Sequence, residues 1–395
     1  MRRLILAAAL LALVAACSKT KDVDRPKQLV PFTASLRVMH AWSASVGGTR
    51  KPLRLGLDLA VEGERVYAAG REGEVAAFDL ATGRRIWGRR LKAALSGGPG
   101  ADAQMVVVGS SAGDVFALAA ADGAVLWHAN IAGEILAAAA VTPRLVVVRA
   151  VDGKLHALTA SNGHEIWQVQ QPVPSLSLRG TSRPTIIGDV AICGFDNGKV
   201  VAANLSDGSS AWETVITPAR GSNEIERLND VDATPRVTGS DVYVAQFQGK
   251  VAKLALDSGQ IWWSHDMSSY RGMAVDGDDL YVVTADGEVI AIRASTGVEL
   301  WKQNALLHRP LSAPAVWGDA IAVADYQGYV HWLDVKTGAL IGRARSGKRP
   351  ILSAPVAAGG LVIVMNERGN ITAFRPIPLE TPRPANREGV VKGGR

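Results

Sequence analysis

One short phrase recurs eight times along this chain of 395 residues. It consists of a glycine turn, an apolar run, a second glycine turn and usually a tryptophan, as in EGEVAAFDLATGRRIW and DGEVIAIRASTGVELW. A repeat of nearly constant period constrains the fold strongly, because each unit buries its apolar face only against its neighbours. The first glycines of the eight copies lie 38 to 51 residues apart: Gly73, Gly113, Gly153, Gly198, Gly249, Gly287, Gly328 and Gly369.

Each of the first seven repeats contains four short apolar runs, and no repeat shows a helical period. The run LDVKTGALI has a glycine near the end of a short turn, where a positive φ is needed, which indicates a β-hairpin. The first run of a repeat often follows a proline, a residue that is tolerated at the start of a strand. Four antiparallel strands in about 42 residues form one blade of a β-propeller. The sequence therefore predicts an all-β, eight-bladed β-propeller of four-stranded antiparallel blades.

A strand from the N-terminus is expected to complete the last blade. The eighth copy has no outer strand, because the chain enters a proline-rich tail at Arg375, whereas the run VMHAWSASV precedes the first copy. Pairing these two ends would close the ring and remove its free edges. We expect Trp42 to occupy the slot that Trp87 has in its own blade. The tryptophans are interpreted as packing pieces between blades. A cofactor stack is the alternative, and regular repetition argues against it.

The N-terminus has the layout of a secretory signal peptide. Two arginines precede thirteen apolar residues that end at Ala16, which is shorter than the roughly 20 residues of a membrane span. The run VAAC, which ends at Cys17, resembles the lipobox of bacterial lipoproteins. This resemblance implies cleavage before Cys17, acylation of Cys17 and, with Ser18 next, anchoring in the outer membrane. The alternative is an ordinary signal peptide with an incidental cysteine.

These features divide the chain into four parts. Residues 1–16 are the signal peptide, and residues 17–38 are a lipidated flexible tether that could reach roughly 70 Å. Residues 39–375 are the propeller. Residues 376–395, rich in proline, glycine and charge, are expected to be a disordered tail.

Composition excludes several classes of function. The 43 basic and 37 acidic residues are scattered, so no nucleic-acid partner is expected. Once Cys17 is acylated, Cys193 has no partner for a disulfide. It is interpreted as a buried strand residue, with a catalytic thiol as the alternative. The histidines lack the spacing of zinc ligands, and no phosphate-binding loop is present.

Two long connections between repeats mark a candidate binding surface. The chain takes 17 residues from Trp167 to Pro184 and 23 from Trp212 to Pro235, against 12 from Trp87 to Pro99. Links of this kind emerge on one face of a propeller, so the two enlarged loops are predicted to stand side by side. Insertions on one face often form a binding surface.

The same loops resemble those of a known family. The hairpin pattern DxxTGxxxW is similar to the blades of pyrroloquinoline-quinone enzymes. The stretches PSLSLRG, at 174–180, and EIERLNDVDATP, at 224–235, resemble loops of the BamB family, lipoproteins of the outer-membrane β-barrel assembly machinery. The resemblance covers the chain from Cys17 to about residue 375. It implies a non-enzymatic scaffold on the periplasmic side of the outer membrane that assists folding and insertion of β-barrel proteins.

The resemblance also implies partners. The expected partner is the POTRA region of BamA, the central barrel-assembly protein, and unfolded outer-membrane proteins are further candidates. Leu176 and Leu178 alternate with serine, so both are expected to face the same way. The structural alternative is that Arg179 and the aspartates only tie the two loops together. The residues that the resemblance assigns to the POTRA contact, with Arg227 added from its position in the loop, are Leu176, Leu178, Arg179, Asp230, Asp232 and Arg227.

Two other classes of function are a quinone-dependent dehydrogenase and a saccharide-binding protein. A quinone-dependent dehydrogenase is typically longer and has an adjacent Cys-Cys pair and a bound calcium ion. This chain has no such pair, and its acidic cluster at 224–232 lacks a calcium-binding pattern. No cofactor, metal or catalytic residue is therefore expected. Passive binding of a saccharide in the central channel stays open from sequence.

Overall fold

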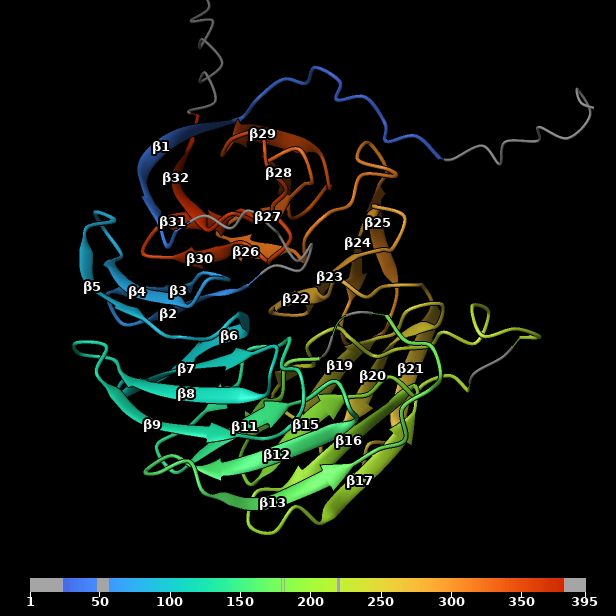
Figure 1. The fold of residues 1–395 in the computed structure, drawn as a ribbon. Helices are drawn as coiled ribbons and strands as arrows, with labels where there is room; N and C mark the ends of the chain where they lie inside the picture. Colours follow the sequence, from blue (N-terminus) through green and yellow to red (C-terminus); the bar gives the residue numbers. More distant parts are fainter. Residues whose placement is uncertain (1–23, 48–56, 179, 181, 219–220, 380–395) are drawn as a thin grey trace, which may run out of the picture.

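Eight four-stranded antiparallel sheets stand around a central axis in the computed structural model of this chain (Figure 1). The structure describes residues 24–47, 57–178, 180, 182–218 and 221–379. The prediction of an all-β, eight-bladed propeller is confirmed. In the described part of the chain, no helix is long and apolar enough to cross a membrane.

Blades 1 to 4 follow the chain, each running from an inner to an outer strand. Blade 1 comprises β2 (Leu59–Glu62), β3 (Arg65–Ala69), β4 (Glu74–Asp79) and β5 (Arg85–Arg90). Blade 2 comprises β6 (Leu95–Ala101), β7 (Met105–Ser110), β8 (Asp114–Ala119) and β9 (Val125–Asn130). Blade 3 comprises β10 (Ala140–Val141), β11 (Leu145–Arg149), β12 (Lys154–Thr159) and β13 (Glu165–Gln170). Blade 4 comprises β14 (Thr185–Ile187), β15 (Val190–Gly194), β16 (Lys199–Asn204) and β17 (Ser210–Val215).

Blades 5 to 7 repeat this order, and blade 8 combines both ends of the chain. Blade 5 comprises β18 (Arg236–Thr238), β19 (Asp241–Ala245), β20 (Lys250–Ala255) and β21 (Ile261–Asp266). Blade 6 comprises β22 (Met273–Asp276), β23 (Asp279–Val283), β24 (Val289–Arg293) and β25 (Glu299–Gln303). Blade 7 comprises β26 (Ala315–Trp317), β27 (Ala320–Ala324), β28 (Tyr329–Asp334) and β29 (Leu340–Arg345). Blade 8 comprises β30 (Val356–Ala358), β31 (Leu361–Met365), β32 (Asn370–Pro378) and β1 (Leu36–Ser45).

The repeated tryptophan fastens each blade to the next one. Trp87 lies on β5 opposite Ala77 of β4, so a large residue fills the space above a small one. Its ring packs under the turn of blade 2, where a Cβ added to Gly123 would meet the ring at 2.5 Å, and Gly123 has a φ of +73°. Its Nε1–H donates to the carbonyl oxygen of Ala120 in that turn. We call this arrangement the tryptophan clasp.

Seven such clasps connect the ring, which confirms that the tryptophans pack between blades. Trp42 on β1 forms the clasp from blade 8 to blade 1 and faces Ala373, so its predicted slot is also confirmed. The distances from Nε1 to the turn oxygen are 2.7–3.0 Å in Trp42–Leu80, Trp87–Ala120, Trp127–Ala160, Trp167–Leu205, Trp212–Leu256, Trp263–Ala294 and Trp301–Val335.

The junction of blades 7 and 8 is built differently. Here the large and small partners are exchanged, because Trp332 lies on β28 and faces Gly342 on β29. Trp332 is fully buried, and its ring meets Phe374 of β32 edge-on, with ring centroids 5.8 Å apart. The third and fourth strands of blade 8 come from opposite ends of the chain, so no hairpin turn joins them. A tryptophan at position 342 would therefore have no turn carbonyl to bond.

The strand that closes the ring is longer than expected. β1 pairs with β32 from Leu36 opposite Pro378 to Ser45 opposite Asn370, so the paired strands extend beyond 39–375 by three residues at each end. Residues 376–378 thus belong to the sheet and not to the tail. Residues within 27–35, expected to be part of the free tether, instead contact blade 7 and the link from β25 to β26. The signal peptide, Cys17 and residues 380–395 lie outside the described residues.

The clasp predicts unequal effects of the same substitution at two tryptophans. Trp127→Phe removes a donor and leaves the carbonyl of Ala160 without its partner, whereas the Nε1 of Trp332 is buried with no partner. Both changes remove the same volume from a buried site. We expect Trp127→Phe to lower the free energy of unfolding by about 1–3 kcal/mol more than Trp332→Phe, measured by urea denaturation. An equal or larger loss for Trp332→Phe would contradict the clasp.

Candidate partner-binding surface

The two enlarged loops lie side by side, as predicted. The first, residues 171–184, joins β13 to β14, and the second, residues 216–235, joins β17 to β18. The second loop projects from the ring as the yellow-green segment at the right of Figure 1. Two hydrogen bonds join the first loop to the second: Ser175 Oγ donates to Glu224 Oε2 at 3.0 Å, and Ser182 Oγ donates to Ala233 O at 3.2 Å. A third joins the start of β14 to the end of the second loop, from Thr185 Oγ1 to Pro235 O at 2.9 Å.

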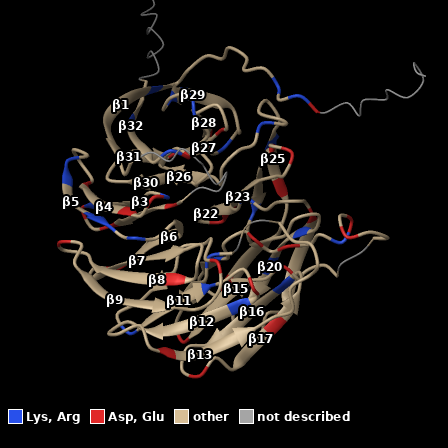
Figure 2. Ribbon diagram, viewed as in Figure 1, with Lys and Arg blue, Asp and Glu red and all other residues tan. Residues whose placement is uncertain are grey.

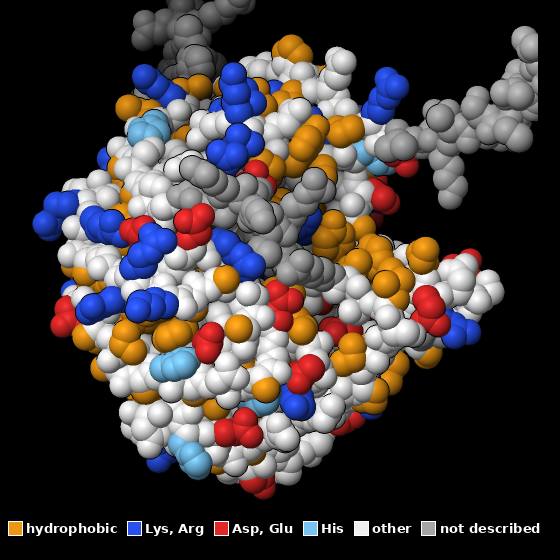
Figure 3. Space-filling view, viewed as in Figure 1, with side chains coloured by type: hydrophobic (Ala, Val, Ile, Leu, Met, Phe, Trp, Pro, Cys, Tyr) orange, Lys and Arg blue, Asp and Glu red, His pale blue; other side chains and the backbone are white. Residues whose placement is uncertain are grey.

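Three large aliphatic side chains are exposed among the described residues of these loops. Ile225 is 65% exposed, Val173 is 42% exposed and Leu176 is 41% exposed, so apolar side chains of both loops face solvent. Ile225 was missed from sequence, although an isolated isoleucine in the polar run SNEIER was the available signal. Figure 3 shows further apolar side chains on the visible surface between the ring and this projection.

A turn closed by its own side chains presents Ile225. Glu226 accepts hydrogen bonds from the backbone N–H and the hydroxyl of Ser222, at 2.8 and 3.0 Å, and Asn223 Oδ1 accepts from the N–H of Glu226. The bonds from Ser222 hold the pKa of Glu226 below its ordinary value. Arg227 donates to the carbonyl of Gly221 at 3.1 Å, so it also stabilises the turn.

The predicted acidic residues lie deeper than the apolar ones. Asp230 is fully buried, and its Oδ2 accepts from the backbone N–H of Leu178 on the other loop. The carboxylate thus ties the two loops together, as the structural alternative proposed. Leu178 is half-buried and lines the central channel together with Asp232. The loop bends at Ser175 and Leu176 instead of running extended, so the two leucines differ in exposure. Arg179 lies outside the described residues.

A buried ion pair supports the base of the loops. Arg149, at the end of β11, lies 3.2 Å from Asp196 and stacks 4.4 Å above the ring of Phe195. Sequence reasoning missed this pair, although an arginine that ends the apolar strand LVVVR was the available signal.

Elsewhere charges of both signs are interspersed around the ring (Figure 2).

Burial shifts the acid–base behaviour of these carboxyls. Burial raises the pKa of Asp230 to about 7. The hydrogen bond from the backbone N–H of Leu178 acts to lower this pKa, and the nearby charge of Asp196 raises it further. Burial, followed by the charges of Asp230 and Asp196, raises the pKa of Asp232 well above its ordinary value. A raised pKa favours the neutral form of a carboxyl, and burying a neutral carboxyl costs less than burying a charged one.

A cysteine, the metal-ligating side chains and the central channel are the other places where chemistry or ligand binding could occur. Cys193 is a free, fully buried thiol on β15, and burial raises its pKa to about 12, so it carries no thiolate at neutral pH. Within the described ranges, no group of three metal-ligating side chains could hold a metal ion. The central channel has a volume of about 1020 Å³, and its polar lining includes Arg183, Arg236 and Arg271.

The raised pKa of Asp230 predicts a pH dependence of stability. Because the pKa in the folded state, about 7, exceeds the ordinary 3.8, the folded state binds more protons between these values. The contribution of Asp230 to stability is therefore complete below about pH 4 and is lost as the pH rises through 7. We expect Asp230→Asn to reduce the fall in unfolding free energy between pH 5 and 8, by on the order of 2 kcal/mol. Urea denaturation at both values measures it, with exposed Asp257→Asn as the control; an unchanged pH slope would refute it.

Comparison with known proteins identifies the family. The sequence profile described as outer membrane protein assembly factor BamB matches residues 71–303 and 294–376. A protein of that name from Pseudomonas aeruginosa is 43% identical over 364 residues, which cover 92% of this chain and 96% of that protein. The protein of that name from Escherichia coli is 35% identical over 385 residues, covering 94% of this chain and 98% of that protein.

Solved structures agree with this relationship. The crystal structure of BamB from Moraxella catarrhalis has a TM-score of 0.79 at 27% identity and covers 86% of this chain and 100% of that one. The quinohemoprotein alcohol dehydrogenase from Comamonas testosteroni has a TM-score of 0.68 at 14% identity, covering 88% and 77%, and this likeness shows the fold alone. The profile match and the identity over most of the chain show that this protein belongs to the family of the outer membrane protein assembly factor BamB.

Proposed function

We propose that this chain is a non-enzymatic scaffold in outer membrane protein assembly. The names of its relatives support this role, and one observation carries the molecular part of the proposal. Two enlarged loops from adjacent blades are hydrogen-bonded to each other and carry the exposed apolar side chains of Leu176 and Ile225. Exposed apolar anchors on a supported surface are typical of protein–protein interfaces.

The proposed partner is a POTRA domain of the central barrel-assembly protein. Leu176 and Ile225 would enter apolar depressions of that domain, and Arg179 would donate to its carboxylates or carbonyls. The buried carboxylate of Asp230 holds the first loop in position through the N–H of Leu178 and does not itself face the partner. Holding that domain in a productive orientation would assist insertion of β-barrel proteins, and unfolded barrel proteins are a further proposed partner.

The proposed location is the periplasmic side of the outer membrane. The VAAC run supports acylation at Cys17, and at least two acyl chains would anchor the protein durably. Catalysis is not part of the proposal. The chain lacks the adjacent cysteine pair of quinone-dependent dehydrogenases, and its two cysteines are 176 residues apart.

If this interface binds the barrel-assembly protein, two different double substitutions should each weaken capture of that protein. Leu176→Ala with Arg179→Ala, and separately Leu176→Ala with Ile225→Ala, should each reduce co-purification of the barrel-assembly protein at least about tenfold, because each buried anchor is worth about 1–3 kcal/mol. The measurement is affinity capture from detergent-solubilised membranes, with quantification of the partner.

The control is Leu126→Ala, since Leu126 is 50% exposed on β9, away from both loops. It should leave capture unchanged, and all variants should keep the melting temperature of the parent protein. Undiminished capture by both paired variants would remove the interface from the proposal.

A further inference from the structure

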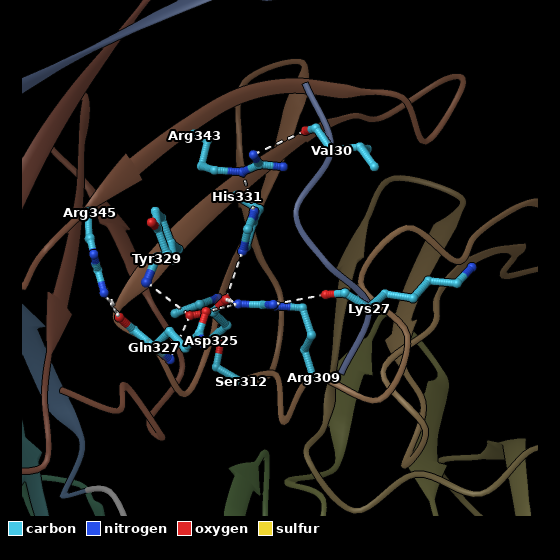
Figure 4. Close-up of polar contacts among 11 residues, drawn as sticks. Lys27, Val30, Arg309, Ser312, Asp325, Gln327, Tyr329, His331, Arg343 and Arg345 are labelled. Atoms are coloured by element: carbon cyan, nitrogen blue, oxygen red, sulfur yellow. Dashed lines mark hydrogen bonds and ion pairs between the residues drawn. The ribbon is translucent and has the colours of Figure 1, made fainter. Parts of the chain in front are cut away.

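The segment before β1 is bound to the ring, as Figure 4 shows. The backbone N–H of Lys27 donates to the carbonyl of Leu307 at 3.0 Å, and its Nζ donates to the carbonyl of Asn304 at 3.1 Å. Arg309 donates to the carbonyl of Lys27 at 3.0 Å, and Arg343 donates to that of Val30 at 3.3 Å. We call residues 27–32 the strap.

Apolar contacts add to these bonds. Leu29 and Phe32 are half-buried and pack against the apolar core between blades 6 and 7. The guanidinium of Arg343 lies 4.9 Å from the centre of the Phe32 ring. Partial burial of these two apolar side chains removes apolar surface from water, which favours docking of the segment.

A buried polar network positions the two arginines. The Nε and Nη2 atoms of Arg309 donate hydrogen bonds to Oδ2 of Asp325, at 3.0 and 2.6 Å. Its Nη1 atom donates to the carbonyl of Lys27 in the strap. His331 lies 3.2 Å from the same carboxylate and accepts from Nε of Arg343 at 3.2 Å. Both arginines are thus oriented by blade 7 before the strap binds. Such preorganisation lowers the entropy lost on docking.

The strap runs from one face of the ring to the other. In a four-stranded meander, the link from an outer strand to the next blade lies on the loop-bearing face, and the turn between the third and fourth strands lies on the opposite face. β1 is the fourth strand of blade 8, so its first residue, Leu36, lies at the opposite face. The strap crosses back over blade 7 and ends at Leu307, in the link from β25 to β26 on the loop-bearing face.

We propose that the strap determines the face of the ring from which the membrane tether leaves. Without it the tether would leave from the face opposite the two enlarged loops, and with it the tether leaves on the same face as the loops, beside blades 6 and 7. This inference rests on the acylation of Cys17 in the proposed function.

Docking also shortens the tether. Ten residue steps separate Cys17 from Lys27, which span at most about 35 Å at 3.3–3.6 Å per residue. The free tether predicted from sequence could reach roughly 70 Å. Docking of the strap therefore places the loop-bearing face, and not the opposite face, next to the shortened tether.

The first test measures docking alone. Leu29→Cys should react with a maleimide reagent at least about tenfold more slowly than Asp24→Cys, because Leu29 is half-buried and Asp24 is exposed. Cys193 is buried and serves as the unreactive background. Adding Phe32→Ser should bring the rate at position 29 close to that at position 24. Equal rates in the parent background would show that the strap does not dock.

The second test measures orientation on membranes. A donor dye is placed at Lys348→Cys, in the link from β29 to β30 on the loop-bearing face, or at Lys336→Cys, in the turn between β28 and β29 on the opposite face. Both lysines are exposed and belong to the same region of the ring. The full-length acylated protein is bound to phosphatidylethanolamine–phosphatidylglycerol vesicles that contain acceptor lipids. We expect more energy transfer from position 348 than from position 336.

Strap variants complete the second test. Leu29→Ser with Phe32→Ser should abolish or invert the difference between the two dyes, whereas Val30→Ser, whose side chain is 51% exposed, should preserve it. Equal transfer in the parent protein, or a difference that survives the double substitution, would overturn the proposal. Failure of the protein to float with vesicles would instead show that the acyl anchor of the proposed function is wrong, and the inferred tether would fall with it.

Discussion

The ring depends on a single contact that is repeated seven times. An indole on the outer strand of one blade lies under the turn glycine of the next and donates its N–H to a turn carbonyl. In six of the seven clasps the residue opposite the tryptophan within the blade is alanine, whereas Trp263 lies opposite Lys253. Each clasp also uses a glycine with positive φ in the turn of the neighbouring blade. Because each clasp fixes one blade relative to the next, the geometry propagates around the ring, and connections between blades are held at defined positions.

The candidate binding surface uses this rigidity. Its two loops leave from adjacent blades, so packing of the blades by itself holds the bases of the loops next to each other. Asp230, buried with a pKa near 7, then joins one loop to the other through the backbone of Leu178. Apolar side chains remain at the tips, and the ion pair of Arg149 and Asp196 lies at the base. A docking surface needs exposed side chains that are held in place by buried contacts, and these two loops have that arrangement.

The seam of the ring shows what replaces the clasp where it cannot form. Blade 8 has no hairpin turn at the required position, and there Trp332 moves to the third strand while β1 closes over Gly342. The chain that precedes β1 continues across blade 7 and is held by Arg309 and Arg343. One continuous segment therefore both closes the ring and continues as the strap across blade 7.

The sequence by itself determined the blades, their number, the role of the tryptophans, the closing strand and the adjacency of the two loops. Each of these follows from a local pattern that recurs along the chain, or from a copy that departs from it. A pattern that is ambiguous in one copy becomes interpretable when it recurs in eight. Only the tertiary structure decided that Asp230 is buried, that Ile225 is exposed and that residues 27–32 are docked. These depend on contacts that occur once, such as the bond from Arg309 to Lys27 across 282 residues of chain. No periodicity encodes such a contact, because it joins two residues far apart in the chain and occurs once.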